Sequence, residues 1–391
     1  MNILFLAPQP FMEKRGTPLA VFQVLKALGE LGHSIDLVTY HLGEDRRIEG
    51  VKHFRTPSFP FIKKVKKGQS LAKVFLDVFV FIKALNLLKK NSYDCIHAVE
   101  EAATMGIFLK GFYNKPLIYD MDSSMPDQLR DSTSPFWSNG ALLRLVGFFE
   151  KKTIGHADLV LAVCKALMEK VHLVFPDKPV VLLEDIPNVE PFDPSMKDKV
   201  EHLKTQLGLT KNKVILYTGT FESYQGIDLL LASVANIVTD FPRVKLVLVG
   251  GDGDQVGEKS SIVKSMGIER NVLILGKRPL EEMPLFMEMA DLLVSPRNKG
   301  TNTPMKIYTY LQSGKPVVAT RMLTHTQVLT DDVAILVNAD HKSFSRGIMR
   351  VLKDSELGER IGRAGKKLVQ ENYSYGSFKK KVEKAYGLIK K

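Results

Sequence analysis

Three basic side chains, Arg297, Lys299 and Lys306, gather in one short segment of the chain. A β-branched run ends at Ser295, a polar loop containing glycine follows, and a helix is expected to begin near Pro304 with Thr303 as its N-cap. Free backbone amides at a helix N-terminus, together with nearby cations, bind phosphate. The segment therefore predicts a diphosphate site. A solvated basic loop explains it less well, because the three cations flank a single helix start.

Glycine turns follow two other predicted strands. Gly219 lies between a strand that includes Leu216 and a helix that starts after Gly226, which is a common arrangement for binding phosphate. A tight turn needs glycine for steric reasons as well, so this motif alone is weak. Gly250 and Gly251 close another strand, but the following glycines miss the GxGxxG spacing of dinucleotide-binding proteins, which argues against a dehydrogenase.

A turn with the sequence Arg15-Gly16-Thr17-Pro18 follows the first predicted strand. Thr17 is expected to cap a helix over 18–31, with Pro18 at its first position. The turn could bind an anion or an acceptor molecule, or it could simply start a well-capped helix. These two interpretations remain equally good.

Acidic side chains follow two predicted strands of the amino-terminal half. Glu100 and Glu101 come after one strand, and Asp120 and Asp122 close the next. The carboxyl ends of parallel strands meet at one edge of a sheet, where open α/β folds bind ligands. These carboxylates could contact acceptor hydroxyls or act as a base, and the alternative for each is a charge in the first turn of a helix.

Short apolar runs alternate with helical segments along almost the whole chain, which predicts an α/β fold with parallel sheets. The expected strands are 3–7, 34–40, 95–98, 117–121, 159–163 and 180–183, followed by 214–218, 244–249, 272–275, 292–295, 316–319 and 334–337. A segment rich in proline, 186–194, separates the two series. We predict one domain over 1–187, a second over 188–372, and a C-terminal docking helix over 373–391.

The C-terminal helix carries Phe378, Val382, Ala385 and Leu388 at helical spacing, with lysines on its other face. This apolar stripe is expected to pack on another element. A return of the helix to the first domain is one option.

The composition indicates the cellular location and the classes of partner that are expected. The chain has 391 residues, a formal charge of +12 and two cysteines far apart in sequence, Cys95 and Cys164, which favours reduced buried thiols and a cytoplasmic location. Zinc-finger spacings and nucleic-acid-binding motifs are absent, so we expect no nucleic-acid partner.

One segment raises the question of membrane contact. The apolar stretch 71–88 contains Lys73, Asp77 and Lys83, so it is not expected to span a bilayer. Preceded by Lys63, Lys64, Lys66 and Lys67, it could rest on anionic lipid at the inner face of the membrane or simply cover a sheet.

Taken together, these motifs resemble family-4 (group 1) glycosyltransferases of the GT-B fold, over nearly the whole chain. The resemblance implies two doubly wound, Rossmann-like domains facing a cleft. It also implies hexosyl transfer with retention from a nucleotide-diphosphate sugar to a glycan or a lipid-linked acceptor, without a metal or other cofactor.

The resemblance also assigns residues, with the donor in the second domain and the acceptor in the first. The expected donor-binding residues are Gly16, Gly219, Thr220, Glu222, Gly251, Arg297, Lys299, Asn302, Thr303, Lys306 and Thr309. The expected acceptor-binding residues are Arg15, Thr17, Glu100, Glu101 and Asp120, and the expected catalytic residues are Asp122, Arg297 and Lys306.

The sequence departs from the family pattern at several of these positions. Thr220 and Gln225 stand where the family has an arginine and a lysine for the diphosphate, Thr309 replaces a glutamate, and Asp122 replaces a histidine. We predict that Arg297, Lys299 and Lys306 have taken over diphosphate binding. The alternatives are a non-catalytic protein that binds glycan or nucleotide sugar, and a GT-B nucleotide-sugar epimerase.

Overall fold

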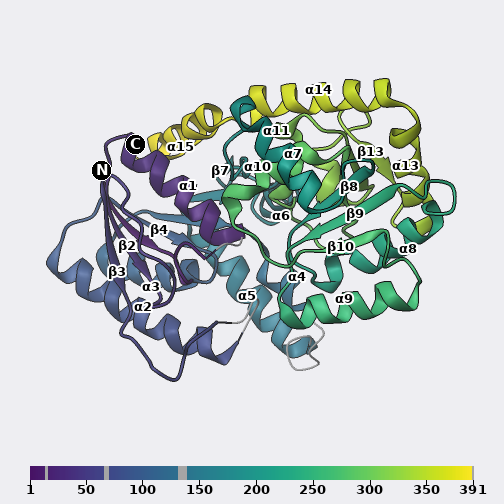
Figure 1. Ribbon diagram of the computed structural model, residues 1–391. Coiled ribbons are helices and arrows are strands. Elements are labelled where there is room, and N and C mark those ends of the chain that lie inside the picture. The colour runs from purple at the N-terminus through teal and green to yellow at the C-terminus, as the bar shows by residue number, and fades with distance from the viewer. Residues whose placement is uncertain (14–15, 66–69, 131–138, 390–391) are drawn as a thin grey trace. The chain divides into compact units, whose positions relative to one another are not determined.

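The computed structural model describes residues 1–13, 16–65, 70–130 and 139–389. The chain forms two compact units, one of Met1–Asp185 with Tyr375–Lys391 and one of Ile186–Ser374 (Figure 1). Each unit has its own parallel sheet with helices on both faces. The predicted α/β class with two doubly wound domains is confirmed.

The sheet of the first unit has the strand order β3-β2-β1-β4-β5-β6-β7 within the described residues. All neighbouring strands are parallel. Its strands are β1 (Asn2–Leu6), β2 (Ser34–Thr39), β3 (Val51–Arg55), β4 (Cys95–Val99), β5 (Leu117–Met121), β6 (Leu159–Ala162) and β7 (Val180–Leu182). Its helices are α1 (Gly16–Glu30), α2 (Leu71–Lys90), α3 (Ala102–Tyr113), α4 (Met125–Arg130), α5 (Gly140–His156), α6 (Lys165–Val174) and α15 (Tyr375–Ile389).

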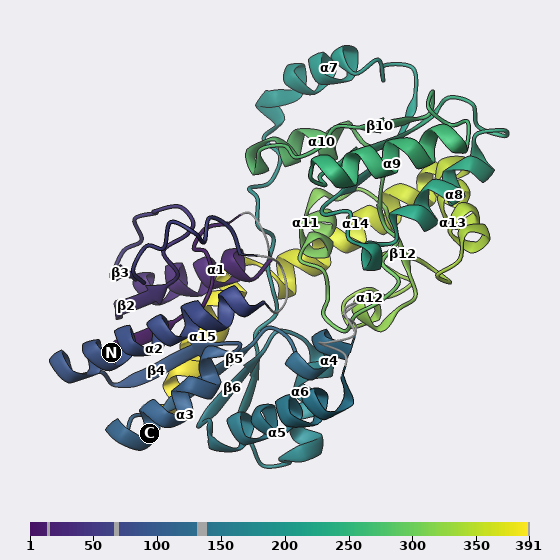
Figure 2. The ribbon, with the colours of Figure 1, turned by 90° about the horizontal axis from the view of Figure 1, so that it is seen from below.

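The strand order determines which face of this sheet each helix covers. Connections between parallel strands are right-handed, and the chain moves outward from β1 in opposite directions to β2 and to β4. Helix α1 therefore covers one face, where α15 packs beside it, while α2, α3, α5 and α6 cover the other. Side chains of β1, β4, β5 and β6 form the core beneath this second group. Figure 2 shows α2, α3 and α5 from another side.

The sheet of the second unit has the order β10-β9-β8-β11-β12-β13, again with parallel neighbours. Its strands are β8 (Lys213–Thr218), β9 (Val244–Val249), β10 (Val272–Ile274), β11 (Leu292–Ser295), β12 (Val317–Thr320) and β13 (Ile335–Val337). Its helices are α7 (Lys197–Gln206), α8 (Ile227–Ile237), α9 (Gly253–Ser265), α10 (Met283–Met289), α11 (Lys306–Ser313), α12 (Leu323–Thr326), α13 (His341–Lys353) and α14 (Ser355–Asn372). Two separate apolar clusters fill the space on either side of the sheet.

The structure corrects several local predictions. Strand β3 was not predicted, because it is an edge strand that carries Lys52, His53 and Arg55 and lacks the apolar run of a buried parallel strand. Thr17 does not cap the first helix, since α1 already begins at Gly16. Thr303 does not cap α11, whose N-cap is Met305 and receives no side-chain cap.

Helix α15 belongs to the first unit, which confirms that the end of the chain returns to this fold. Its buried face consists of Phe378, Val382, Ala385 and Tyr386. The prediction for Leu388 was wrong, because its side chain is 45% exposed and Tyr386 takes the inward position. Both cysteines are free and buried, as predicted.

Candidate active site

Lys306 is the most unusual cation in the second unit. It is the first residue of α11, and its Nζ donates a hydrogen bond to Oε1 of Gln225 over 3.2 Å. The same ammonium lies 3.8 Å from the centre of the Tyr217 ring. The hydroxyl of Tyr217 also donates a hydrogen bond to Oε1 of Gln225, and it donates to the carbonyl of Thr220 as well. The cation is thus held against the end of β8 by an amide and an aromatic face.

The charge of Lys306 is poorly compensated by the protein. No carboxylate forms an ion pair with it among the residues that the structure describes. Burial, and after it the positive charge of Arg297, lowers the pKa of Lys306 well below the usual value of a lysine. An anion bound beside Nζ would therefore relieve an electrostatic penalty as well as accept a hydrogen bond.

Arg297 shapes the loop that precedes α11. Its Nε donates to the carbonyl of Lys299 over 2.8 Å and one Nη donates to the carbonyl of Asn302 over 3.2 Å. The guanidinium also lies 5.1 Å from the centre of the Tyr224 ring. Gly300 has φ +101° and passes so close that a Cβ there would lie 2.5 Å from an Nη atom. Arg297 therefore has a structural role in its own loop in addition to its charge.

Two glycines make room for this arrangement. A Cβ on Gly219, where φ is +134°, would lie 2.8 Å from Nζ of Lys306. A Cβ on Gly250, where φ is +130°, would lie 1.9 Å from the carbonyl oxygen of Gly219. The turns after β8 and β9 thus need glycine for their backbone conformation and for their close approach.

The other donor residues predicted for this unit lie in mixed surroundings. The Thr303 hydroxyl is buried without a hydrogen-bond partner among the described residues, and the Lys299 side chain is exposed. The Glu222 carboxylate accepts from Gln255 over 3.3 Å, and Gly251 passes close to the Phe221 ring.

Two other predicted donor residues take part through their backbone. The carbonyl of Thr220 accepts from Tyr217, and the carbonyl of Asn302 accepts from Arg297. Thr309 is committed elsewhere, because its hydroxyl donates to Oδ1 of Asn188 over 2.9 Å.

In the first unit, the predicted acidic residues lie at the carboxyl ends of β4 and β5. Glu100 adopts a left-handed conformation with φ 48°, its N–H donates to the carbonyl of Asp120, and its carboxylate accepts from Ser123 over 2.8 Å. Asp122 accepts a hydrogen bond from the Thr17 side chain. Thr17, Glu100, Asp120 and Asp122 are therefore brought to the same edge of this sheet.

Proton affinity is high at this edge. Burial raises the pKa of Asp122 well above its usual range, and the charges of Asp120 and Glu100 add to the effect. Burial and the neighbouring Glu101 raise the pKa of Glu100 in the same direction. Such carboxyl groups can exchange between donating and accepting a hydrogen bond to a sugar hydroxyl.

Asp120 is tied to the C-terminal helix. Its Oδ2 lies 3.1 Å from Nε2 of His97, and Nδ1 of that ring lies 2.7 Å from the hydroxyl of Tyr386. The imidazole also stacks on Phe5, with the ring centres 4.0 Å apart. Sequence reasoning missed this chain of contacts, because nothing local links His97 to a residue of α15.

Glu101 lies near other acidic residues, but its carboxylate is bound to α2. Its carboxylate forms an ion pair with Nζ of Lys73 on α2 over 2.5 Å. Near it, Asp77 accepts from the Tyr40 hydroxyl over 2.6 Å. The predicted role of Glu101 in binding the acceptor thus competes with an internal ion pair.

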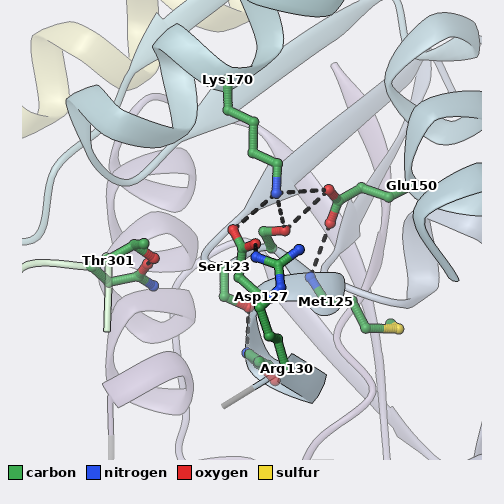
Figure 3. A network of polar contacts seen from close by, with 10 residues as sticks. Ser123, Met125, Asp127, Arg130, Glu150, Lys170 and Thr301 are labelled. Carbon is green, nitrogen blue, oxygen red and sulfur yellow. Dashed lines mark hydrogen bonds and ion pairs between the residues drawn. The ribbon is translucent and has the colours of Figure 1, made fainter. Parts of the chain in front are cut away.

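A polar network fixes the segment that follows β5 (Figure 3). Glu150 accepts from the Met125 N–H over 2.9 Å and from the Ser124 hydroxyl over 3.1 Å. Nζ of Lys170 bridges Asp127 over 2.9 Å and Glu150 over 3.4 Å. These contacts hold the start of α4, and with it Ser123, the hydrogen-bond donor to Glu100.

Arg15 and Gly16, which were predicted to bind the acceptor and the donor, follow β1 in the sequence. Arg15 lies outside the described residues. Gly16 begins α1, and a Cβ there would meet no described atom within 4 Å. Among the described residues, no group of three His, Cys, Asp or Glu side chains is placed to hold a metal ion.

Models of known families match both halves of the chain. Residues 15–183 match the model described as Glycosyltransferase Family 4, and residues 199–368 match that of glycosyl transferases group 1. A putative glycosyltransferase of Bacillus subtilis, YtcC, is 21% identical over 76% of this chain and 74% of its own length. The N-acetyl-alpha-D-glucosaminyl L-malate synthase of Bacillus anthracis is 25% identical over 56% of this chain and 57% of its own length.

Solved structures agree with this assignment at the level of the fold. Anabaena HepE in complex with UDP has a TM-score of 0.77 and 19% sequence identity, over 99% of this chain and 100% of the other. The same protein in complex with UDP-glucose has the same TM-score, over 99% of each chain.

Fold and family models together define a glycosyltransferase of the GT-B class. Within that class, the chain belongs to glycosyltransferase family 4, with a carboxyl-terminal half of the group 1 type.

Proposed function

We propose that this glycosyltransferase transfers a hexosyl group, with retention, from a nucleotide-diphosphate sugar to a glycan or a lipid-linked acceptor. The donor is assigned to the second unit and the acceptor to the first. The observation that carries the proposal is the Lys306 ammonium, which lies at the end of β8 with an amide and an aromatic ring as its partners. HepE, a structural neighbour, is bound to UDP and to UDP-glucose, which supports the class of donor.

Lys306 also accounts for a departure from the family pattern. The family resemblance places a lysine at position 225, where this chain has a glutamine. Nζ of Lys306 lies 3.2 Å from the side-chain oxygen of Gln225. A cation is therefore present beside the position from which one is missing, and it is supplied by α11 instead of by the turn after β8.

In the proposed mechanism, Lys306, with the charge of Arg297 nearby, neutralises the diphosphate as it leaves. The bond between the anomeric carbon and the phosphate oxygen breaks, and a bond to the acceptor oxygen forms on the same face of the sugar. The acceptor proton passes to the departing phosphate oxygen. Preorganised positive charge stabilises such a leaving group without reorganisation during the reaction. No metal ion or other cofactor is assigned a role.

The acceptor is proposed to bind through the carboxyl edge of the first sheet. Burial raises the pKa of both Glu100 and Asp122. The charge of Glu101 adds to the effect on Glu100, and the charges of Asp120 and Glu100 add to that on Asp122, so each can share a proton with a sugar hydroxyl. Asp122 is proposed to orient the attacking hydroxyl. Asp120 is positioned by its contact with His97 and is proposed to bind the acceptor.

The test compares Lys306→Ala with a control variant, Lys211→Ala, which removes an exposed lysine of the same unit. Loss of one preorganised cation is expected to lower kcat by roughly 10²–10³-fold. Binding of UDP should weaken while binding of uridine stays unchanged, because only UDP carries the diphosphate. The measurements are calorimetric titration and a transfer assay, after a thermal-shift screen of UDP, GDP and ADP sugars.

Three outcomes would contradict the proposal. Near-normal transfer by Lys306→Ala would remove this lysine from the mechanism. Binding of nucleotide sugar without transfer to any acceptor would indicate a non-catalytic binding protein. Isomerised sugar formed without an acceptor would indicate an epimerase.

A further inference from the structure

The outer surface of the first unit has an unusual apolar character. Most of the large hydrophobic side chains that are exposed in the described residues lie on α2, α3 and α5 or on the loop before α2. They are Phe61, Leu71, Val74, Phe75, Val78, Ile82, Phe108, Phe112, Leu145, Phe148 and Phe149. We call these residues the apolar face. Isolated exposed hydrophobic residues are normal, but a group of this extent marks an interaction surface.

The apolar face extends over three helices that pack against one another. Helix α3 packs against α2 on one side and against α5 on the other, and all three cover the same face of the sheet (Figure 2). On α3, the side chains of Phe108 and Phe112 are 57% and 74% exposed, one turn apart. Phe61, which is 75% exposed, joins α2 through contacts with Phe59 and Phe75.

Positive charge borders the apolar face, and negative charge is turned away from it. Exposed cations lie at the end of α2 and along α5: Lys89, Lys90, Arg144, Lys151 and Lys152. The two acidic residues of α2, α3 and α5 are both engaged on the inner side. Asp77 accepts from Tyr40, and Glu150 accepts from Ser124 and the Met125 N–H. The exposed charged side chains of these helices are therefore cations, which lie beside the aromatic and aliphatic groups.

We propose that the apolar face binds the headgroup region of an anionic lipid bilayer. Apolar side chains inserted at the interface, with lysines at headgroup level, are the chemistry of proteins that lie on membranes. A second copy of this chain fits less well, because like charges would meet across such a contact. In the described residues, no helix is both long and apolar enough to cross a bilayer, so this surface contact does not depend on a membrane span.

This inference goes beyond the proposed function, since it concerns a surface that carries none of the proposed donor- or acceptor-binding residues. The test uses the full chain and vesicles of phosphatidylglycerol mixed with phosphatidylcholine, with phosphatidylcholine alone for comparison. No sugar donor or acceptor is present. Co-sedimentation with the anionic vesicles is expected at low salt, together with a marked loss of binding at high salt.

Two double variants test the surface itself. Phe108→Ser with Phe112→Ser should reduce partitioning by roughly tenfold or more, because buried aromatic area is lost. Lys151→Glu with Lys152→Glu should also reduce it by at least roughly tenfold, since each lysine near an anionic surface contributes to the attraction. The second variant leaves the aromatic packing in place, which keeps the test valid if the first variant folds poorly.

Matched controls come from exposed residues of the second unit. Met266→Ser with Leu323→Ser removes exposed apolar groups, and Lys264→Glu with Lys342→Glu reverses exposed charges. Both controls should bind vesicles as the unaltered chain does. UDP binding should be the same in every variant, which separates this test from that of the transferase.

The proposal is overturned if the unaltered chain does not co-sediment with anionic vesicles. It is also overturned if the apolar-face variants bind as well as the controls. Self-association that is abolished by Phe108→Ser with Phe112→Ser, without vesicle binding, would assign the face to a second copy instead.

Discussion

Lys306, at the start of α11, combines a half-buried ammonium with an uncharged hydrogen-bond partner. The side-chain oxygen of Gln225 accepts a hydrogen bond from the ammonium without neutralising its charge. Burial and the charge of Arg297 consequently lower the pKa of Lys306. The positive charge of Lys306 is therefore electrostatically unfavourable in the free protein. A bound diphosphate would compensate this charge, which is a physical reason for anion affinity at this position.

The lowered pKa of Lys306 predicts a pH dependence of UDP binding. Only the protonated amine binds the diphosphate well, so affinity should fall as the pH rises through this lowered pKa, at a lower pH than for an ordinary lysine. Binding near that pKa should also take up a proton. Calorimetry in buffers of different ionisation enthalpy measures the uptake, and Lys306→Arg should abolish it because arginine stays charged. Proton uptake that persists in Lys306→Arg would assign the titration to another group.

At the scale of elements, α15 shows how a C-terminal segment becomes part of the first unit. Its inner face places Phe378, Val382 and Ala385 next to elements of that unit, and Lys381 forms an ion pair with Glu184 over 2.5 Å. The Tyr386 hydroxyl reaches His97 at the centre of the sheet. The helix therefore supports the strand end that carries Asp120, as well as covering apolar surface.

Tyr386→Phe tests that support. Removing the hydroxyl leaves the buried imidazole of His97 without this hydrogen bond, which should lower the free energy of unfolding by about 1–2 kcal/mol. Urea denaturation measures the change. The control is Tyr113→Phe on the half-exposed end of α3, where only a small effect is expected. A variant as stable as the unaltered chain would show that the contact contributes little.

At the scale of the whole molecule, buried carboxyl groups of the first unit make stability depend on pH. Burial, and after it the charges of Asp120 and Glu184, raises the pKa of Asp185 to about 7. Burial and the nearby Glu101 raise the pKa of Asp77 to about 7 as well. The folded state thus favours the neutral forms, whereas in the unfolded chain these groups ionise near the usual aspartate pKa of 3.8. The stability that these groups contribute is complete below that value and is lost as the pH rises to about 7.

Asp185→Asn should therefore stabilise the protein in neutral and alkaline solution, by of the order of 1–2 kcal/mol, and less in acid. Urea denaturation in acidic and in mildly alkaline buffer gives the two values. The exposed Asp177 supplies a control, since Asp177→Asn should change stability equally little in both buffers. An equal gain from Asp185→Asn in both buffers would mean that burial of the charge is not the cause.

Much of the architecture could be predicted from local patterns. Apolar runs located every strand except β3, since a buried parallel strand requires continuous hydrophobicity while the edge strand Val51–Arg55 does not. The glycine turns at 219 and 250 were also visible, because their conformation demands that residue type. The helix starts at Thr17 and Thr303 were misplaced, because both threonines lie close to the real starts and have typical capping side chains.

The amino-acid sequence by itself determined the two α/β sheets and the family, since hydrophobic period and glycine position are local properties. Tertiary structure alone decided which side chains meet. Lys306 faces Gln225 across 81 positions, and His97 meets Tyr386 across 289. Burial, which raises or lowers the pKa of each group, likewise arises only when distant segments exclude water together.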